Sequence, residues 1–250
     1  MRIYTCAPDW DAMLTTIYEA SRSGLKHTEI KLLLEPVEQY TLFDEYIHVE
    51  KDYLKASKVS ESIRNRISAF FYREMLITSM AYEEDVLDNI YHTLILGYTF
   101  GDKVLDMLKY RDIVRNREIR TRVGREADRF QEITRFHQVG NVYIAHIEPK
   151  SRVVSYLGPI FQDRMPSEHF VIIDDIHLEA CIHQKDEDYY LRKLTRSEFE
   201  SLKESEEIND EFTDLWKAFF DSIAIKERNN QKCQTTHFPI WARKHAVEFM

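Results

Sequence analysis

Glycine, proline and cysteine are all scarce in this sequence, and each shortage narrows what the protein can be. Six glycines and six prolines in 250 residues are too few for extensive disorder or low-complexity segments. The three cysteines are far apart and form no Cys-x-x-Cys pair, which argues against a zinc ribbon or an iron–sulfur cluster held by this chain. We therefore expect three reduced thiols.

Long apolar segments are missing as well. The opening residues, MRIYTCAPDWD, include no apolar stretch of the kind that directs secretion. The longest apolar run, around residues 91–100, is much shorter than the roughly 20 residues that span a bilayer, and it contains His92, Thr93 and Gly97. We expect a cytoplasmic protein with no membrane partner.

Motifs that identify common enzymes by their spacing are also absent. The sequence has no glycine-rich phosphate loop, no Gly-x-Ser-x-Gly elbow and no His-x-Glu…Cys-x-x-Cys deaminase signature. Four histidines fall in or near a predicted sheet: His137, His146, His177 and His183. His146 and Glu148 share a strand face, so a His/Glu metal site could be assembled here. No compact motif such as His-Glu-x-x-His supports one, and we expect no metal and no other cofactor.

The sequence does contain enough apolar material for a buried core. Hydrophobic residues make up 44% of the chain and aromatic residues 12%, and its length suits one large domain or two small ones. After a short strand over 2–5, a helix is predicted to begin with Asp9 as its N-cap and to end near Gly24. Apolar residues then recur at helical spacing from about 54 to 107.

The hydrophobic period changes near residue 139 from helical spacing to alternation. Alternating residues predict a strand over 142–148, and a hairpin is predicted over 169–182 with Asp174 and Asp175 at or near its turn. Further predicted elements are a strand that begins at Val153 and Val154, a short helix over 156–164, a strand over 188–194, a helix capped by a box of Thr195 and Glu198, and a helix over 212–225.

This order of elements predicts an α+β fold. It has a helical N-terminal half, a small antiparallel sheet in the middle and a helical C-terminus. We divide the chain into a mainly helical region over 1–136 and an α+β region over 137–250. We expect the two regions to form one compact unit.

Charge is distributed unevenly along the chain, whose formal net charge is −9. Residues 186–211 hold ten acidic and four basic residues, a local sum of −6, whereas residues 109–125 hold seven basic and two acidic residues, a local sum of +5. The Debye length is about 8 Å at physiological salt, so a basic patch acts locally and the net charge does not exclude nucleic-acid binding. The alternative is that these arginines pair with nearby acids on a solvated helix face.

Two further stretches have both a structural and a functional interpretation. Asp174 and Asp175 could supply general acid–base chemistry, although acidic pairs at turns commonly serve turn geometry. Lys226, Arg228 and Asn229 follow a predicted amphipathic helix, where cations complement the helix dipole. The same side chains could instead contact phosphates and base edges.

Several fragments together resemble a known bacterial family. They are "READRFQEITRF", "YIAHIEPKSRVVSYLGPIFQDRMP", "FVIIDD" and "LWKAFFDSIAIKERNN", and the fragments "YTCAPDWDAMLTTIYEA" and "KDYLKASKV" extend the resemblance to almost the whole chain. The family comprises DNA metabolism and DNA repair proteins with a domain of unknown function. Its members are encoded beside a radical S-adenosylmethionine (radical SAM) protein, and some are fused to a uracil-DNA glycosylase domain.

The resemblance implies functional positions wherever its motifs match. The matching polar residues are Arg129, Arg135, Glu148, Arg164, Asp174, Arg228 and Asn229, and the matching aromatic residues are Phe136, Tyr143, Phe161, Trp216 and Phe220. The sequence departs from the family pattern at four positions. Asp128 and Ile160 stand where a histidine is usual, His146 where an arginine is usual, and Asp175 where a basic residue is usual.

From these observations we expect an accessory protein of DNA metabolism or repair that acts with a radical SAM enzyme and binds DNA itself. Arginine presents several donors to a phosphate, and an exposed aromatic ring can stack on a base. The expected DNA-binding residues are Arg129, Arg135, Arg164, Lys226, Arg228, Asn229, Tyr143 and Phe161.

Two alternatives from other functional classes stay open. One is an enzyme that acts on DNA bases, with Glu148 and Asp174 as its acid–base groups. The other is a protein-interaction module without enzymatic activity, which would use the acidic segment 186–211 to dock a basic partner.

Overall fold

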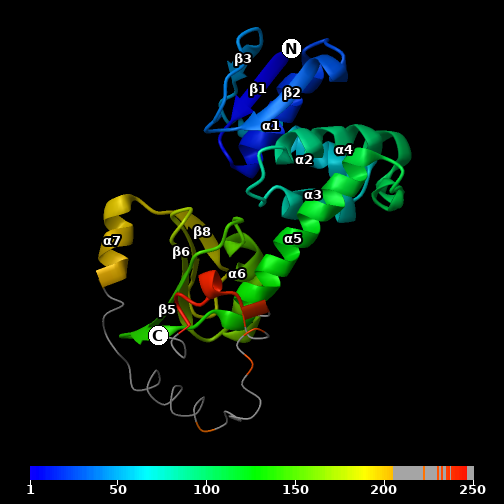
Figure 1. Ribbon diagram of the computed structural model, residues 1–250. Helices are drawn as coiled ribbons and strands as arrows, with labels where there is room; N and C mark the ends of the chain where they lie inside the picture. The colour runs from blue at the N-terminus through cyan, green and yellow to red at the C-terminus, as the bar shows by residue number, and fades with distance from the viewer. Residues whose placement is uncertain (205–221, 223–229, 231, 233–234, 237, 247–250) are drawn as a thin grey trace. The chain divides into compact units, whose positions relative to one another are not determined.

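The computed structural model describes residues 1–204, 222, 230, 232, 235, 236 and 238–246 (Figure 1). Contacts within the chain divide it into two compact units, Met1–Gly124 and Arg125–Met250. The division falls inside helix α5 (Arg111–Ile133), before the boundary after residue 136 that the sequence predicts. Each unit has its own sheet and is described by itself.

The first unit contains a parallel sheet that the sequence predicts only in part. Its strands are β1 (Arg2–Cys6), β2 (Ile30–Leu34) and β3 (Glu45–His48), in the spatial order β2-β1-β3. Both neighbours run parallel to β1, and helix α1 (Trp10–Arg22) connects β1 to β2. The strand predicted over 2–5 is confirmed. So is the helix cap, because Asp9 accepts a hydrogen bond from the Ala12 backbone N–H at 3.1 Å.

Helices form most of the remainder of this unit. They are α2 (Tyr53–Arg66), α3 (Ala69–Thr78), α4 (Val86–Phe100) and the first part of α5. The helical spacing over 54–107 therefore predicts α2, α3 and α4 correctly. Phe71, Met75 and Ile90 from α3 and α4 are fully buried in the core. The correction concerns the sheet: the N-terminal half is not only helical, because β2 and β3 pair on either side of β1.

The sheet of the second unit is mixed rather than antiparallel, which corrects the prediction. Its strands, in spatial order, are β4 (His137–Val139), β5 (Val142–Ile147), β6 (His169–Asp174), β7 (Glu179–His183) and β8 (Tyr190–Lys193). β5 and β6 are parallel, and the other neighbours are antiparallel. The reason is that helix α6 (Val154–Arg164) connects β5 to β6, and such a crossover aligns the two strands in parallel.

Helix α6 begins earlier than the sequence predicts. Val153 and Val154 are predicted to begin a strand, and they form instead the buried N-terminus of this helix. Their β-branched side chains suit a strand, but burial against the sheet outweighs that preference, as tertiary context commonly does. The predicted hairpin over 169–182 and the strand over 188–194 are confirmed as β6, β7 and β8.

Helix α7 (Arg196–Glu204) covers one face of this sheet, and α6 covers the other. The predicted capping box is confirmed, because the Thr195 backbone N–H donates to Glu198 Oε2 at 2.8 Å and the Glu198 backbone N–H donates to Thr195 Oγ1 at 3.3 Å. Phe199 of α7 packs against a cluster that includes Ile144, whereas α6 contacts β6 and β7.

The fold class is α+β, as the sequence predicts. The helix predicted over 212–225 lies, apart from residue 222, outside the described residues. Among the helices that the structure describes, none combines the length and the apolar composition that crossing a bilayer requires.

Candidate functional site

Two carboxylates meet at the edge of the second sheet where its parallel strands end. Glu148 directly follows β5, and Asp175 directly follows β6. The register pairs Ile147 with Asp174, and the Asp175 backbone N–H donates to the Ile147 carbonyl at 3.0 Å. Glu148 and Asp175 therefore leave neighbouring strands side by side and on the same face. This carboxyl edge of parallel strands is where open α/β sheets bind their ligands.

A buried histidine holds Asp175 in place. The side chain of His146 on β5 has no exposed surface, and its Nδ1 donates to Asp175 Oδ1 at 2.7 Å. The ring of His137 on β4 stacks on that of His146, with centroids 6.4 Å apart. The strand register places His137 on the same face as His146, Glu148 and Asp175.

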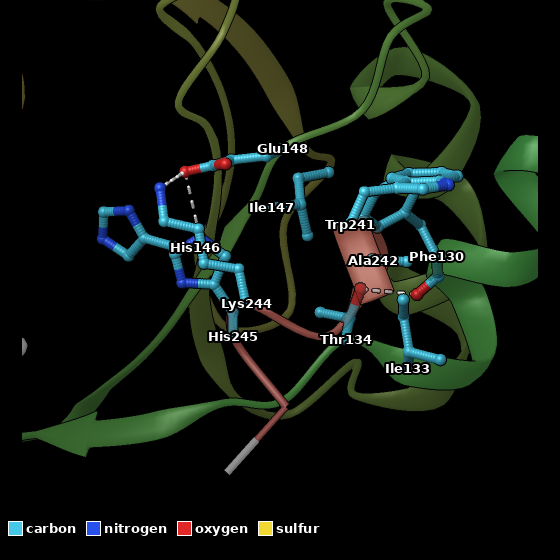
Figure 2. Close-up of a pocket in the computed structure, with 10 residues that line it drawn as sticks. All are labelled: Phe130, Ile133, Thr134, His146, Ile147, Glu148, Trp241, Ala242, Lys244 and His245. Carbon is cyan, nitrogen blue, oxygen red and sulfur yellow. Dashed lines mark hydrogen bonds and ion pairs between the residues drawn. The ribbon is translucent and has the colours of Figure 1, made fainter. Parts of the chain in front are cut away.

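The segment 238–246 completes the cluster from a distant part of the sequence. A short 3-10 helix, η5 (Ile240–Ala242), precedes His245, whose Nε2 lies 3.6 Å from Glu148 Oε1 and 3.8 Å from Asp175 Oδ2. The Lys244 ammonium forms an ion pair with Glu148 (Figure 2). One ligand atom from each of Glu148, Asp175 and His245 lies within 4.8 Å of the other two.

The cluster opens on a small pocket of about 10 Å³, which is room for about one water molecule or ion. Glu148, Lys244 and His245 lie on one side of it, and Trp241 lies on the other (Figure 2). The side chain of Asp175 is only 4% exposed, and its Oδ2 accepts no hydrogen bond from any residue that the structure describes. A buried carboxylate oxygen without a hydrogen bond favours a cation beside it, since an unpaired buried charge is costly.

Asp174, the other residue of the acidic pair, faces the opposite side of the sheet. Its side chain is fully buried. Oδ1 accepts hydrogen bonds from the backbone N–H groups of Ile176 and His177, each at 2.9 Å, and Oδ2 accepts one from His177 Nδ1 at 2.6 Å. These bonds shape the turn between β6 and β7. The structure does not bring Asp174 together with Glu148, and the acid–base role expected for Asp174 fits Asp175 better.

Three of the arginines expected to contact DNA gather near the C-terminal end of α5, where two of them bind backbone carbonyls. Arg135 donates to the carbonyls of Glu132 and Thr134 at 3.0 and 3.3 Å. Arg164 donates to the Gln131 carbonyl at 3.2 Å. Both cations satisfy carbonyls that the helix leaves without an intrahelical partner, which is a structural role.

The third, Arg129, lies beside an exposed indole. Its guanidinium carbon is 5.5 Å from the ring centroid of Trp241, and the Lys150 ammonium is 6.0 Å from the same centroid. Trp241 is 41% exposed. An accessible aromatic ring beside positive charge is the combination that proteins use to bind single-stranded nucleic acid.

The aromatic residues expected to stack on a base are less accessible than Trp241. Phe161 is 4% exposed and packs edge-on against Phe136, with centroids 5.3 Å apart. Tyr143 is half-buried on β5, and alternation places it on the face opposite Glu148. The remaining expected contacts, Lys226, Arg228 and Asn229, lie outside the described residues.

The basic stretch over 109–125 forms ion pairs within the first unit. Its pairs with acids of preceding segments are Arg115 with Asp85, Arg120 with Glu74, and Arg122 with Glu83, at 2.7, 2.8 and 2.9 Å. The hydrogen bonds from Arg115 hold the pKa of Asp85 below its usual range. These three arginines therefore pair with acids on a solvated helix face, which is the alternative to nucleic-acid binding that the sequence leaves open.

Neither cysteine that the structure describes is a candidate nucleophile. Cys6 and Cys181 are fully buried, and burial raises the pKa of Cys6 to about 11 and that of Cys181 to about 12. The thiolate is the reactive form, so both thiols are inert at neutral pH.

The sequence offers Asp175 only as one half of an acidic pair of which Asp174 is chosen, and it gives no role to Trp241 or His245. A signal for Asp175 is present, because it stands beside Asp174 at the end of a predicted strand. No local pattern marks Trp241 or His245, which reach the pocket only through contacts between distant segments.

The pocket and its cluster lie within a known sequence family. A family model described as a domain of unknown function, DUF4130, matches residues 84–248. This span includes Glu148, Asp175 and His245 and leaves the parallel sheet of the first unit outside. No curated protein matches the chain. Because the match covers well over half of the 250 residues, the chain belongs to the DUF4130 family of domains of unknown function.

Proposed function

We propose that this protein binds nucleic acid in DNA metabolism through the surface around Trp241. The observation that carries the proposal is the exposed indole beside the Arg129 guanidinium and the Lys150 ammonium. The same indole lines the pocket that contains Glu148 and His245. A base stacked at this position would lie next to groups that can exchange a proton or hold a cation.

Positive charge around Trp241 can act on a nucleic acid in spite of the net charge of −9. Acidic residues more than a Debye length of about 8 Å away are largely screened at physiological salt. Each phosphate contacted adds about 0.7 to the slope of log affinity against log salt for a single strand, and about 0.9 for a duplex. Contacts from Arg129 and Lys150 therefore predict a slope of about 1 to 2.

The test is a titration of labelled single-stranded and double-stranded DNA at two salt concentrations. We expect binding that weakens as salt rises. Trp241→Ala should weaken it by about 1–3 kcal/mol, the range for removing an aromatic ring that stacks on a base. Arg129→Gln should lower the salt slope.

Tyr53→Ala is the matched control for this titration. Tyr53 is also an exposed aromatic residue, and the Lys51 ammonium lies 5.0 Å from its ring centroid, but it belongs to the first unit. Its removal should leave DNA binding unchanged. Binding that does not respond to salt, or an equal loss from Trp241→Ala and Tyr53→Ala, contradicts the proposed surface.

The histidine–carboxylate cluster favours a second, enzymatic function, which is acid–base catalysis on a DNA base. Glu148 and His245 are partly exposed and line the pocket together with Trp241, so both can reach a base that stacks on this ring. Asp175 lies behind them and can stabilise positive charge on the imidazole. We expect Glu148→Gln and His245→Gln to abolish base conversion, measured by mass spectrometry of nucleosides from treated DNA. Conversion that survives both substitutions rules this function out.

The proposal includes a radical SAM enzyme as partner, which rests on the family resemblance. The described part of the acidic segment supports a docking surface there. β8 is the edge strand of its sheet and is exposed along its length, and exposed strand edges pair with partner strands. Co-purification of the radical SAM enzyme after nuclease treatment supports direct docking. Co-purification that requires DNA contradicts it.

A further inference from the structure

We infer that Glu148, Asp175 and His245 bind one divalent cation of the zinc class, and that His146 positions Asp175 for it. The sequence predicts no metal site, because the three ligands stand far apart in the chain and form no spacing motif. The site goes beyond nucleic-acid binding and does not depend on it. Three observations support the site: the distances between the ligand atoms, the burial of Asp175 Oδ2 without a hydrogen bond from the described residues, and the hydrogen bond from His146 to Asp175.

The ligand atoms lie slightly farther apart than a small ion requires. His245 Nε2 is 3.6 Å from Glu148 Oε1 and 3.8 Å from Asp175 Oδ2, and the three lie within 4.8 Å of one another. Ligands at about 2.0–2.1 Å from a tetrahedral zinc ion stand about 3.3 Å apart. Both contacts of His245 exceed ordinary hydrogen-bond length, so small side-chain movements toward a shared ion would convert them into ligation.

Asp175 gives an independent indication of a ligand. Its side chain is 4% exposed, and Oδ2 lacks a hydrogen-bond donor among the residues that the structure describes. Buried carboxylate oxygens are almost always hydrogen-bonded or bound to a metal. The pocket beside it, of about 10 Å³, is about the size of one water-sized sphere. Asp175 does not line this pocket, but Glu148 and His245 do, so a cation between these two residues and Asp175 would satisfy Oδ2 at the inner edge of the pocket.

His146 supplies the outer contact that metal-binding carboxylates commonly have. Its Nδ1 donates to Asp175 Oδ1 at 2.7 Å, and this bond leaves Oδ2 on the side of His245. Outer partners of this kind fix the orientation of a ligand and change metal affinity by about 10–100-fold when removed. His146 does not touch the proposed ion and acts only through Asp175.

The ligand set selects among ions. One imidazole nitrogen with two carboxylate oxygens suits Zn²⁺, Mn²⁺ or Fe²⁺, whereas Mg²⁺ and Ca²⁺ prefer oxygen ligands alone. The Lys244 ammonium pairs with Glu148 and therefore competes with the ion for that carboxylate. Because the Lys244 side chain is 58% exposed, it can leave Glu148 for solvent when a metal binds.

The test is calorimetric titration of Zn²⁺ into the full chain after chelator treatment, with no DNA present. We expect one ion per chain at this site, and at least tenfold weaker binding for Glu148→Gln and for His245→Gln. Lys244→Gln should tighten binding. The absorption spectrum of bound Co²⁺ should show a tetrahedral site with nitrogen and oxygen ligands.

Glu50→Gln is the matched control. Glu50 pairs with His48 at 3.1 Å, so it is also a glutamate paired with a histidine, and its replacement should leave the stoichiometry and the affinity unchanged. The inference is overturned if the wild-type chain binds no Zn²⁺, or if Glu148→Gln and Glu50→Gln weaken binding equally. Because no DNA is present, these outcomes are separate from failure of the proposed nucleic-acid surface.

The positioning role of His146 has its own test. Asparagine can donate an amide N–H from a place close to that of Nδ1, whereas leucine cannot. We expect His146→Leu to weaken Zn²⁺ binding by about 10–100-fold and to change the Co²⁺ spectrum. His146→Asn should restore most of both. Equal losses in the two variants, measured at a temperature at which circular dichroism shows that both are folded, contradict the positioning role.

Discussion

In each unit a group of histidine and carboxylate side chains lies where parallel strands end. The two groups differ in how many of their carboxylate oxygens accept a hydrogen bond. In the first unit Glu35 Oε1 accepts hydrogen bonds from Thr5 Oγ1 and His48 Nδ1, each at 2.6 Å, and His48 Nε2 contacts Glu50 at 3.1 Å. The His48 side chain is 47% exposed. In the second unit His146 and Asp175 are buried, and Asp175 keeps one oxygen without a hydrogen bond from the described residues.

Strand topology brings histidine and carboxylate side chains together in both units. Whether such a group can bind a ligand depends on how deeply it is buried and on whether its polar atoms already have hydrogen bonds. The first group is solvated, and its carboxylate–histidine contacts are of ordinary hydrogen-bond length, so a ligand has little to gain there. The second group lies beside a pocket, and its Asp175 Oδ2 is buried without a hydrogen bond from the described residues, so a cation would supply an interaction that this oxygen lacks. Parallel strand ends alone would not separate the two.

The largest expected effect on stability comes from replacing the histidine of each group with leucine. His146→Leu removes the hydrogen bond to a carboxylate that is almost fully buried, and leaving a buried charged group without its partner costs more than the roughly 1–3 kcal/mol of a neutral one. His48→Leu breaks exposed pairs, which contribute about 0–1 kcal/mol. Differential scanning calorimetry, which can resolve separate transitions of the two units, should show a large loss only for His146→Leu. Equal shifts would mean that burial does not distinguish the groups.

A second comparison concerns adjacent carboxylates in one turn. Asp174 accepts three hydrogen bonds, and Asp174→Asn should cost about 1.5–3 kcal/mol because bonds to a charged group are lost. Asp175→Asn keeps an acceptor for His146 and removes a buried charge that lacks a second hydrogen bond, so it should cost less stability than Asp174→Asn. Urea denaturation measures both. Zn²⁺ binding should respond in the opposite order, with the larger loss for Asp175→Asn. A larger loss of Zn²⁺ binding for Asp174→Asn would contradict the assignment of Asp174 as the structural and Asp175 as the functional carboxylate.

The sequence predicts those elements whose signals are local. The Asp9 cap, the helices over 54–107, the hairpin that contains Asp174 and the Thr195 box each depend on neighbouring residues, and each is confirmed. β2 is missed because its sequence, IKLLL, is rich in leucine, which favours helices, and it gains its strand conformation by pairing with β1.

From the sequence, only those site residues that belong to a single predicted strand can be placed together. Glu148 follows a strand that alternation identifies, and His146 shares its face. Whether Asp174 or Asp175 joins them depends on the register of β5 against β6, and a shift of one residue exchanges the faces. That register, and the contact that brings His245 from another segment, are long-range features that no local pattern records.

A smaller effect compares arginines at the two ends of helix α5. Arg115 is bound to Asp85 by two hydrogen bonds, and the pair is partly exposed, so Arg115→Gln should cost about 0.2–1 kcal/mol and leave DNA binding unchanged. Arg129→Gln should leave stability within about 0.5 kcal/mol and weaken DNA binding. Thermal unfolding and the DNA titration test both variants. If Arg115→Gln weakens DNA binding as much as Arg129→Gln, the ion-paired arginines also contribute to the surface.

The smallest effect concerns the pH response of the first group. Its hydrogen bond to Glu35, together with that to Glu50, raises the pKa of His48. A raised pKa in the folded state stabilises the fold fully below the unfolded value of about 6.5, and this contribution is lost as pH rises through the folded value. The melting temperature of the wild-type chain should therefore exceed that of His48→Gln most at about pH 6 and less at higher pH. Glu35→Gln removes the main cause, so most of the pH dependence should disappear in that background. A difference that grows as pH rises would contradict this prediction, because it would mean that the fold stabilises His48 in its neutral form.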